Sequence, residues 1–359
     1  MNPNQESSVV EELAEKISSV FSIYEIQQAE DTIYFFGMPR EDGKGIHQKL
    51  WAIFTEKGYQ YSIKYELGEY ILIASPFKAA GERIWINLVL ALATFLTTMV
   101  MGSFLFGADP ISNPSDVLKG IPFTIAIMTV LGAHEAGHYI VARKHGMHTS
   151  LPYFIPFPSL IGTMGAVIKH RGPIPDRKAL FDVGVSGPLI GLFVSILITA
   201  IGLLQRPIQV TGGGAQIQLA LPPLFEFITY FIPLNETAPL HPVAFAGWVG
   251  MLVTALNLIP VGQLDGGHVL RAMVGEKASR FSRILPFLLI PLGFYITYFQ
   301  NRDGLMWVFW GLFLSLFAAS GHPKPVNDDI PLDKGRMVLG IIAFILGLLS
   351  ITLVPIQVR

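Results

Sequence analysis

The chain has 359 residues; 51% are hydrophobic, 14% are charged, and the formal net charge is −1. In soluble domains roughly a quarter of the residues are charged, so this composition indicates a polytopic membrane protein embedded in a lipid bilayer. The near-neutral charge, with no basic patch, argues against nucleic acid as a partner. The sequence has no cysteine, which excludes disulfides and thiolate ligands and leaves His, Asp and Glu to hold any metal.

Residues 1–76 predict a small soluble, cytosolic domain. An amphipathic helix near residues 11–21 is followed by a strand, a strand, a helix and two strands, at 21–27, 31–37, 45–57, 59–66 and 70–74. This order is typical of a small α/β sandwich. Its role stays open between a solubilising appendage and a regulatory or substrate-handling unit.

Seven apolar stretches then predict a polytopic α-helical membrane protein of about seven spans. They lie at 85–105, 121–142, 179–204, 242–274, 284–299, 305–319 and 337–354. A spanning helix needs about 20 apolar residues, so the fifth and sixth stretches are short and could pair as a hairpin. We divide this part of the chain into a first span at 84–106, a membrane core at 121–274 and C-terminal spans at 284–359.

Two segments do not fit a simple spanning helix. The segment 150–172 is apolar but contains Pro152, Pro156, Pro158, Gly162 and Gly165. Backbone broken by proline survives at membrane depth only where protein or water satisfies its polar groups, so we expect a re-entrant loop or hairpin packed next to the second apolar stretch. The segment 205–240 is long, Gly-rich at Gly212–Gly214 and half-apolar, and we expect an outer loop at the membrane surface.

Lys and Arg are unevenly distributed between the predicted loops. With the N-terminal domain in the cytosol, about 15 of them fall on inner segments and about 4 on outer segments, as the positive-inside rule requires. We therefore expect the N-terminus in the cytosol and the C-terminus outside. The polar, acidic residues 1–19 carry neither a signal core nor a transit character, which favours a prokaryotic (archaeal or bacterial) cell membrane.

The most specific motif is His134-Glu135-Ala136-Gly137-His138, inside the second apolar stretch. HExxH on a helix puts two imidazoles one turn apart on one face with a carboxylate beside them, which predicts Zn²⁺ ligands and a general base, Glu135. Ionisable groups at membrane depth are costly and usually functional. The less favoured alternative is a histidine face that packs against polar groups of a neighbouring helix.

A catalytic zinc takes three protein ligands and keeps one position for water. Acidic residues within the predicted spans are few, and Asp265 stands out among the helix-loosening residues Pro260, Gly262, Gly266 and Gly267. His138 lies about four residues and Asp265 about nine residues from the inner ends of their spans, so both fall roughly 6–14 Å below the inner surface and can meet. A helix N-cap role for Asp265 and ligation by His268 stay open as alternatives.

The HEAGH helix and the segment Asn257-Leu258-Ile259-Pro260-Val261-Gly262-Gln263-Leu264-Asp265-Gly266-Gly267 resemble the paired signatures of the site-2 protease family of intramembrane zinc metalloproteases. The N-terminal domain and the run Asp182-Val183-Gly184-Val185-Ser186-Gly187-Pro188 look closest to the plant chloroplast and archaeal branch of that family. The resemblance covers roughly residues 121–274. It implies that His134, His138 and Asp265 hold zinc, that Glu135 is the base, and that Asn257 binds the substrate backbone or the developing oxyanion.

Other residues carry weaker expectations. Gly162–Ala166 could present an open strand edge to an unwinding substrate, or form a tight packing loop. Gly187, Pro188 and Gly191 are expected to allow close helix contact rather than to serve chemistry. Three histidines of the basic inner loops are expected to face headgroups or solvent: His145, His148 and His170.

Together these features predict a zinc-dependent endopeptidase that cleaves transmembrane segments of other membrane proteins from the cytosolic side. The sequence indicates neither the identity of a substrate nor an oligomeric state. Two other classes stay open: an inactive protease relative that acts as a membrane binding or regulatory module, and a transporter that uses intramembrane His, Glu and Asp. Replacement of Glu135 discriminates, because a protease loses its activity and a binding module does not.

Overall fold

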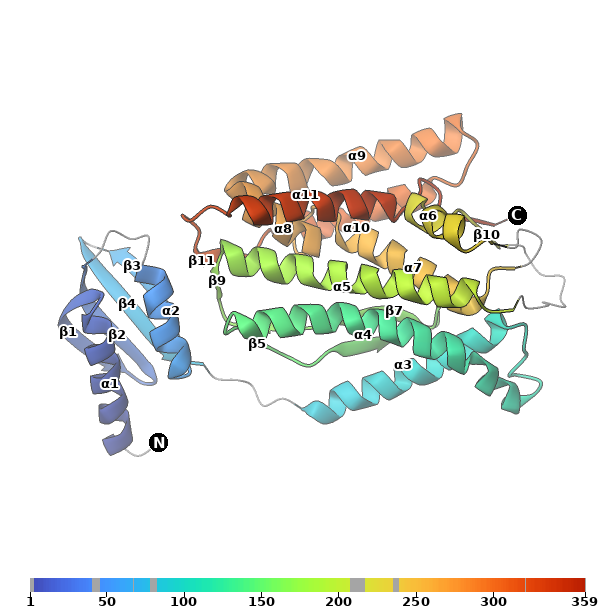
Figure 1. Cartoon of the computed structure of the whole chain (residues 1–359). Coiled ribbons are helices and arrows are strands. Elements are labelled where there is room, and N and C mark those ends of the chain that lie inside the picture. Colours follow the sequence, from blue (N-terminus) through green and yellow to red (C-terminus); the bar gives the residue numbers. More distant parts are fainter. Residues whose placement is uncertain are drawn as a thin grey trace.

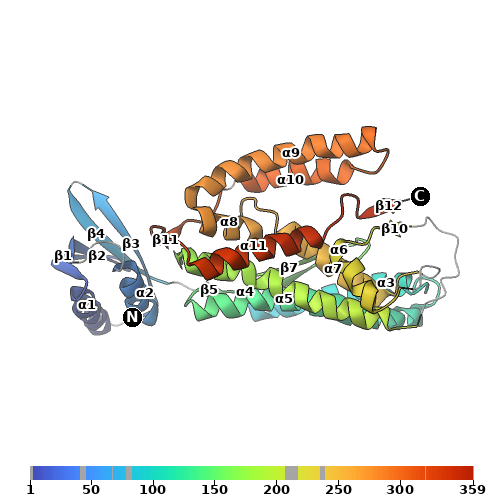
Figure 2. The same cartoon turned by 45° about the horizontal axis from the view of Figure 1, so that its top comes forward.

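The computed structural model describes residues 3–40, 46–66, 68–77, 83–206, 217–234, 239–319 and 321–358. A small α/β domain lies at one end of a bundle of long helices (Figure 1). Turned by 45°, the bundle carries a pair of helices along one side, α9 (Ala278–Phe299) and α10 (Leu305–Ala319) (Figure 2).

The N-terminal domain is a four-stranded antiparallel sheet with two helices. Its elements are α1 (Pro3–Ser18), β1 (Phe21–Ala29), β2 (Thr32–Pro39), α2 (Ile46–Glu56), β3 (Tyr59–Glu66) and β4 (Glu69–Pro76). The strand order is β1-β2-β4-β3, and every neighbouring pair is antiparallel. The elements follow one another in the predicted order.

The alternation of apolar residues decides which face of this sheet is covered. Ile33 and Phe35 of β2 and Leu72 of β4 are buried, whereas the residues between them are more exposed. Helix α2 adds Leu50 and Phe54, which share one helix face because they are four residues apart. Strand period and helix period therefore direct their apolar residues into one common core.

The rest of the chain is mostly helical. Its helices are α3 (Ile84–Leu105), η1 (Pro114–Gly120), α4 (Ile121–Lys144), α5 (Arg177–Leu203), α6 (Pro223–Phe231), α7 (Pro242–Asn257), α8 (Asp265–Val274), η2 (Gly275–Lys277), α9, α10 and α11 (Lys334–Leu349). Among the described residues, four helical stretches are long and apolar enough to cross a membrane: Ile84–Leu105, Pro114–Lys144, Arg177–Leu203 and Asp265–Phe299. Helices α7 and α10 are apolar but shorter. The predicted count of seven spans is not confirmed.

The predicted span 242–274 is two helices instead of one. Helix α7 ends at Asn257 and α8 begins at Asp265, and Gly262 between them has a φ of +53°, a left-handed conformation that favours glycine. The hydroxyl of Ser282 in α9 donates to the carbonyl of Pro260 at 3.0 Å and accepts from the N–H of Gly262 at 3.3 Å. The broken backbone thus finds partners inside the protein, as membrane depth demands.

The proline-rich segment between α4 and α5 is a β-hairpin. Its strands are β5 (His148–Thr149), β6 (Tyr153–Pro156), β7 (Thr163–Val167) and β8 (His170–Arg171), paired as β5–β8 and β6–β7. Side chains of helix α3 form hydrogen bonds with part of the hairpin backbone. The Asn87 amide donates to the carbonyls of Leu151 and Pro152, both at 3.0 Å, and the Thr97 hydroxyl donates to the carbonyl of Gly162 at 2.7 Å.

Two short strand pairs join the C-terminal part of the chain to the bundle. β9 (Ile174–Asp176) pairs in parallel with β11 (Pro325–Asn327), and β10 (Ile217–Leu219) pairs antiparallel with β12 (Ile356–Val358). The pairs lie near opposite ends of the bundle (Figure 1). Of the predicted outer loop, β10 and α6 are described, whereas the glycine run Gly212–Gly214 lies outside the described residues.

The N-terminal domain contacts the bundle just after α4 ends. The indole N–H of Trp51 donates to the carbonyl of His145 at 3.3 Å, and the ring of Phe77 stacks on that of His148 with centroids 4.1 Å apart. Trp51 also packs against the cluster that contains Ala142 and Met147. These contacts attach the domain to the end of the helix that carries the HExxH motif.

We predict that Asn87→Ala loosens the hairpin. The change removes the donor to two carbonyls, a loss on the order of 1–3 kcal/mol for groups shielded from water. Limited proteolysis of the purified protein in detergent should show faster cleavage between residues 150 and 172. Ser103→Ala is the matched control, because this buried α3 hydroxyl donates only within its own helix, to the carbonyl of Val100. Equal cleavage rates for the two variants would contradict the prediction.

Candidate metal centre

Helix α4 presents the HExxH motif inside the protein. His134, Glu135 and His138 have exposed fractions of 4%, 6% and 5%. The two imidazoles lie on the same helix face because they are four residues apart, and their ring centroids are 4.9 Å apart. Two imidazoles buried this deeply need a partner for their ring nitrogens, either a hydrogen-bonding group or a metal ion.

Asp265 supplies a carboxylate to this pair. Its Oδ2 lies 3.2 Å from Nε2 of His134 and 3.3 Å from Nε2 of His138, and the two Nε2 atoms are 3.2 Å apart. Asp265 is the first residue of α8, and the N-cap position belongs to Leu264. The alternative reading of Asp265 as a helix cap is therefore not borne out.

The three atoms fit a tetrahedral metal ion. Ligand atoms bound at about 2.0–2.1 Å in tetrahedral geometry lie about 3.3–3.4 Å apart, close to the separations found here. Two imidazoles and one carboxylate also form a ligand set that catalytic zinc uses. Within the described part of the chain, His134, His138 and Asp265 form the cluster with this geometry, and we name them the metal group. His268, the alternative ligand, is not part of it.

The other ring nitrogen of His138 is also engaged. Its Nδ1 lies 2.8 Å from the carbonyl oxygen of Val183 in α5. A carbonyl can only accept, so Nδ1 carries a proton, and in the neutral ring Nε2 is then the nitrogen that can bind a metal ion. Such a hydrogen bond orients a metal-binding imidazole and fixes its tautomer.

Helix α5 has glycines, which carry no side chain, at the positions where the imidazoles approach it. A Cβ added at Gly187 would overlap Nε2 of His138, and one at Gly191 would lie 2.9 Å from Nδ1 of His134. The sequence predicts only close helix contact for these glycines. The structure specifies the contact: both glycines face the rings of the metal group, and any side chain there would displace a ring.

Glu135 and Asn257 reach the same site from different directions. The Glu135 carboxylate accepts a hydrogen bond from the backbone N–H of Ile168, which directly follows β7. The amide nitrogen of Asn257, at the end of α7, lies 3.2 Å from Nε2 of His134. All five residues singled out from the sequence therefore meet at one place, together with the hairpin.

Sequence reasoning misjudged one residue near this site. His145 was expected to face headgroups or solvent, but its Nε2 lies 3.0 Å from Oδ2 of Asp182. Asp182 in turn contacts Arg336 of α11 through both carboxylate oxygens. An acid inside an otherwise apolar helix was the available signal, but its partners lie far away in the chain and have no motif.

We predict that Gly187→Ala abolishes metal binding, because the added methyl group occupies the place of the His138 ring. The measurement is zinc per mole of purified protein, with thermal unfolding in parallel. Gly202→Ala is the matched control on the same helix, since its Cβ would overlap the backbone of Ala244 far from the metal group. Zinc retained in Gly187→Ala, or lost equally in both variants, would contradict the prediction.

The sequence of the membrane part matches a known family. The sequence model of the family described as "Peptidase family M50" matches residues 122–292. The match includes α4, α5, α7, α8 and thus the whole metal group together with Glu135 and Asn257.

Several curated relatives carry related names. The "Probable zinc metalloprotease EGY1, chloroplastic" of Oryza sativa subsp. japonica is 29% identical over 251 residues, covering 67% of this chain and 41% of the relative. The "Probable zinc metallopeptidase EGY3, chloroplastic" of Arabidopsis thaliana is 27% identical over 289 residues, covering 75% of this chain and 48% of the relative. The chain therefore spans less than half the length of these relatives.

A solved structure, "Site-2 Protease from Methanocaldococcus jannaschii", is 20% identical and covers 67% of this chain and 91% of its own, with a TM-score of 0.33. The match to the family model, over residues 122–292, includes every residue of the metal group.

Proposed function

We propose that the protein is a zinc-dependent intramembrane endopeptidase that cleaves transmembrane segments of other membrane proteins. One observation carries the proposal: two imidazole nitrogens and a carboxylate oxygen converge at 3.2–3.3 Å beside a buried glutamate. This constellation lies within helical stretches apolar enough to cross a membrane. The names of the relatives, as zinc metalloproteases, support the choice of metal.

Zinc held by His134, His138 and Asp265 would act as a Lewis acid that polarises the scissile carbonyl and activates a water molecule. Glu135 takes a proton from that water as its oxygen attacks the carbonyl carbon. When the C–N bond breaks, Glu135 returns the proton to the leaving nitrogen, so that one water is consumed for each peptide bond cut. Burial of Glu135 keeps bulk water from competing for this proton.

Asn257 is placed to stabilise the charge that develops on the carbonyl oxygen. Its side-chain N–H₂ lies beside Nε2 of His134 and could donate to the oxygen of a scissile carbonyl at this site. A fixed amide in a water-poor site needs no reorganisation during the reaction, and one such donor is typically worth 10²–10³ in kcat.

Strand β7 gives the substrate a place to unfold. Peptide bonds inside a helix are already hydrogen-bonded and must be exposed before hydrolysis. β7 pairs with β6 in a sheet of two strands, so its other edge has no strand partner among the described residues. An extended substrate segment added to that edge would be held by main-chain bonds next to Glu135, which Ile168 anchors to the same strand end.

The orientation in the membrane is part of the proposal. The asymmetry of Lys and Arg supports a cytosolic N-terminal domain and an active site near the cytosolic surface. The contact of that domain with the end of α4, the helix that carries His134 and His138, supports the same side for the domain and the metal group. We propose a cell membrane of a prokaryote as the location, although the relatives named above are chloroplastic.

We predict that Glu135→Gln stops cleavage while zinc stays bound, because the amide keeps the shape of the side chain but cannot take a proton. The assay is cleavage of a tagged single-span substrate by the full-length protein in detergent. Removal of zinc by a chelator should stop cleavage of the parent, and added zinc should restore it. Activity that survives in Glu135→Gln would refute the mechanism, and an absence of bound zinc in the parent would refute the function.

We predict that Asn257→Ala lowers kcat by about 10²–10³ with little change in zinc content, because the variant loses an oxyanion donor and no ligand. Steady-state cleavage rates and metal analysis of the same preparation give the two numbers. Leu258→Ala serves as the control for weakened packing at the end of α7, since Leu258 is buried and does not belong to the site. A similar loss of kcat in both variants would remove the assigned role from Asn257.

A further inference from the structure

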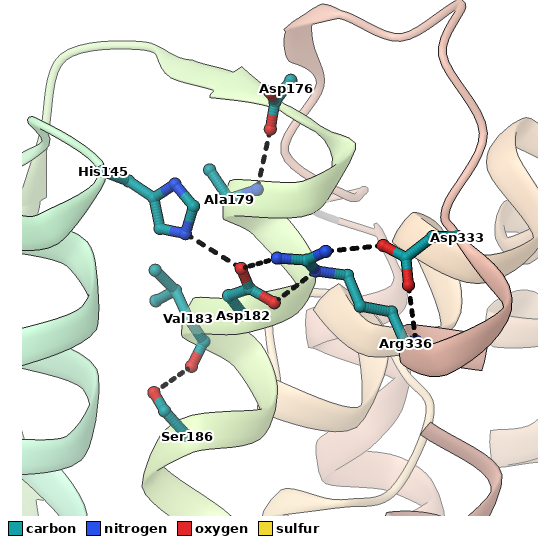
Figure 3. A network of polar contacts seen from close by, with 8 residues as sticks. All are labelled: His145, Asp176, Ala179, Asp182, Val183, Ser186, Asp333 and Arg336. Atoms are coloured by element: carbon teal, nitrogen blue, oxygen red, sulfur yellow. Dashed lines mark hydrogen bonds and ion pairs between the residues drawn. The ribbon is translucent and has the colours of Figure 1, made fainter. Parts of the chain in front are cut away.

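Three donors converge on the carboxylate of Asp182 in the first turns of α5. Nε and Nη2 of Arg336 lie 2.7 Å from its two oxygens, and Nε2 of His145 lies 3.0 Å from Oδ2 (Figure 3). Asp333 holds the guanidinium from its other side and also caps α11 by accepting from the Arg336 backbone N–H. A carboxylate with a bidentate arginine and a histidine has its position set in two directions.

Asp182 is not itself a member of the metal group, but its neighbour in the chain touches that group. The carbonyl of Val183 accepts from Nδ1 of His138 at 2.8 Å and also from the hydroxyl of Ser186 at 2.9 Å. Figure 3 shows Asp182 and Val183 on successive positions of α5, with the carboxylate held by Arg336 and His145. A movement of the Asp182 backbone therefore moves the acceptor that orients His138.

His145 and His138 both belong to the α4 end of this contact. They are seven residues apart, two helical turns or about 10 Å along the axis. Helix α5 is thus tied to α4 at two heights: by Asp182 to His145 at the end, and by Val183 to His138 within the metal group. Two such points fix both the sliding and the rotation of α5 against α4.

Arg336 joins a third helix, α11, to the contact between α4 and α5 at Asp182. It comes from α11, outside the residues that match the peptidase family, and it is the partner that makes the contact bidentate. Asp182 and Arg336 are both partly shielded, with side chains 21% and 31% exposed. An ion pair at this depth is screened less than one at an open surface, so it can hold a fixed geometry.

We propose that Asp182 is a positioning residue for the metal centre. By joining α4 and α11 to α5, its carboxylate holds the Val183 carbonyl where it accepts from Nδ1 of His138, and so keeps Nε2 directed at the metal. The inference rests on the proposed function in one respect, namely that the metal group binds zinc. Residues that orient a metal ligand without binding the metal typically change metal affinity 10–100-fold when they are mutated.

The test uses the full-length protein in detergent and two readouts other than activity. Zinc affinity is measured by competition with a chromophoric chelator, and the geometry of the site by the visible absorption spectrum of the Co²⁺-loaded protein. Asp182→Asn keeps the shape of the side chain and removes its charge. We expect zinc affinity to fall 10–100-fold and the Co²⁺ bands to change in position or intensity. Asp182→Glu, which restores the charge, is expected to recover most of both.

Asp176→Ala is the matched control. Asp176 is an acid at the start of the same helix, where it accepts from the backbone N–H of Ala179 at 2.8 Å (Figure 3). Its loss weakens the helix start but leaves Asp182 and Val183 in place, so the thermal midpoint should fall while zinc affinity and the Co²⁺ spectrum stay as in the parent. An equal loss of zinc affinity in Asp176→Ala and Asp182→Asn would overturn the proposal, since any weakening of α5 would then suffice.

Other outcomes are equally decisive. Zinc affinity and a Co²⁺ spectrum unchanged in Asp182→Asn overturn the inference and leave the proposed function intact, whereas a parent protein that binds no zinc refutes the function itself. If Asp182→Asn cannot be purified folded, Arg336→Lys takes its place, because a lysine keeps the charge but cannot form the bidentate contact. An affinity like that of the parent in Arg336→Lys would then overturn the inference.

Discussion

The close approach of α4 to α5 is the constraint on which the site depends. Two glycines of α5 face the rings of His134 and His138, so that imidazoles lie where a neighbouring helix would ordinarily place a side chain. Lipid tails are as apolar as leucine, and helices in a bilayer therefore associate through close packing of small residues more than through burial of apolar area. The same glycines thus serve helix association and the seating of two metal ligands, and a single methyl group is enough to disturb both.

A second constraint is the need to satisfy backbone polar groups where water is scarce. The break between α7 and α8 places Asp265 at the start of a helix. The Ser282 hydroxyl of α9 forms hydrogen bonds with the backbone of Pro260 and Gly262, which the helices leave unpaired. The hairpin beside Glu135 is met in the same way by Asn87 and Thr97 of α3. Irregular backbone exists beside the metal group because helices distant in sequence supply its partners.

Segments outside the matched family domain therefore contribute to the centre. Helix α3 holds the hairpin, and α11 provides Arg336, which pairs with Asp182. The N-terminal domain adds Trp51, whose indole donates to the carbonyl of His145 at the end of α4. One residue, His145, thereby links the N-terminal domain through its carbonyl and α5 through its ring.

The sequence by itself determined the features that depend on local spacing. Residues four apart on a helix share a face, so the spacing of His134 and His138 predicted a pair of metal ligands. The alternation of apolar residues such as Ile33 and Phe35 predicted the strands of the N-terminal sheet. The choice of Asp265 also followed from sequence, since acids are few in the apolar stretches and its depth matched that of His138.

Tertiary structure decided what depends on contacts between distant segments. The stretch 242–274 was predicted as one span that Pro260 and the glycines after it would break or loosen, but the partner that satisfies the freed backbone is Ser282 of another helix. The contacts of Gly187 with His138 and of His145 with Asp182 likewise follow from the angle and distance at which α4 and α5 pack. The period of apolar residues predicts which residues form a helix. The orientation of one helix against another depends on contacts between distant side chains, which no local sequence pattern predicts.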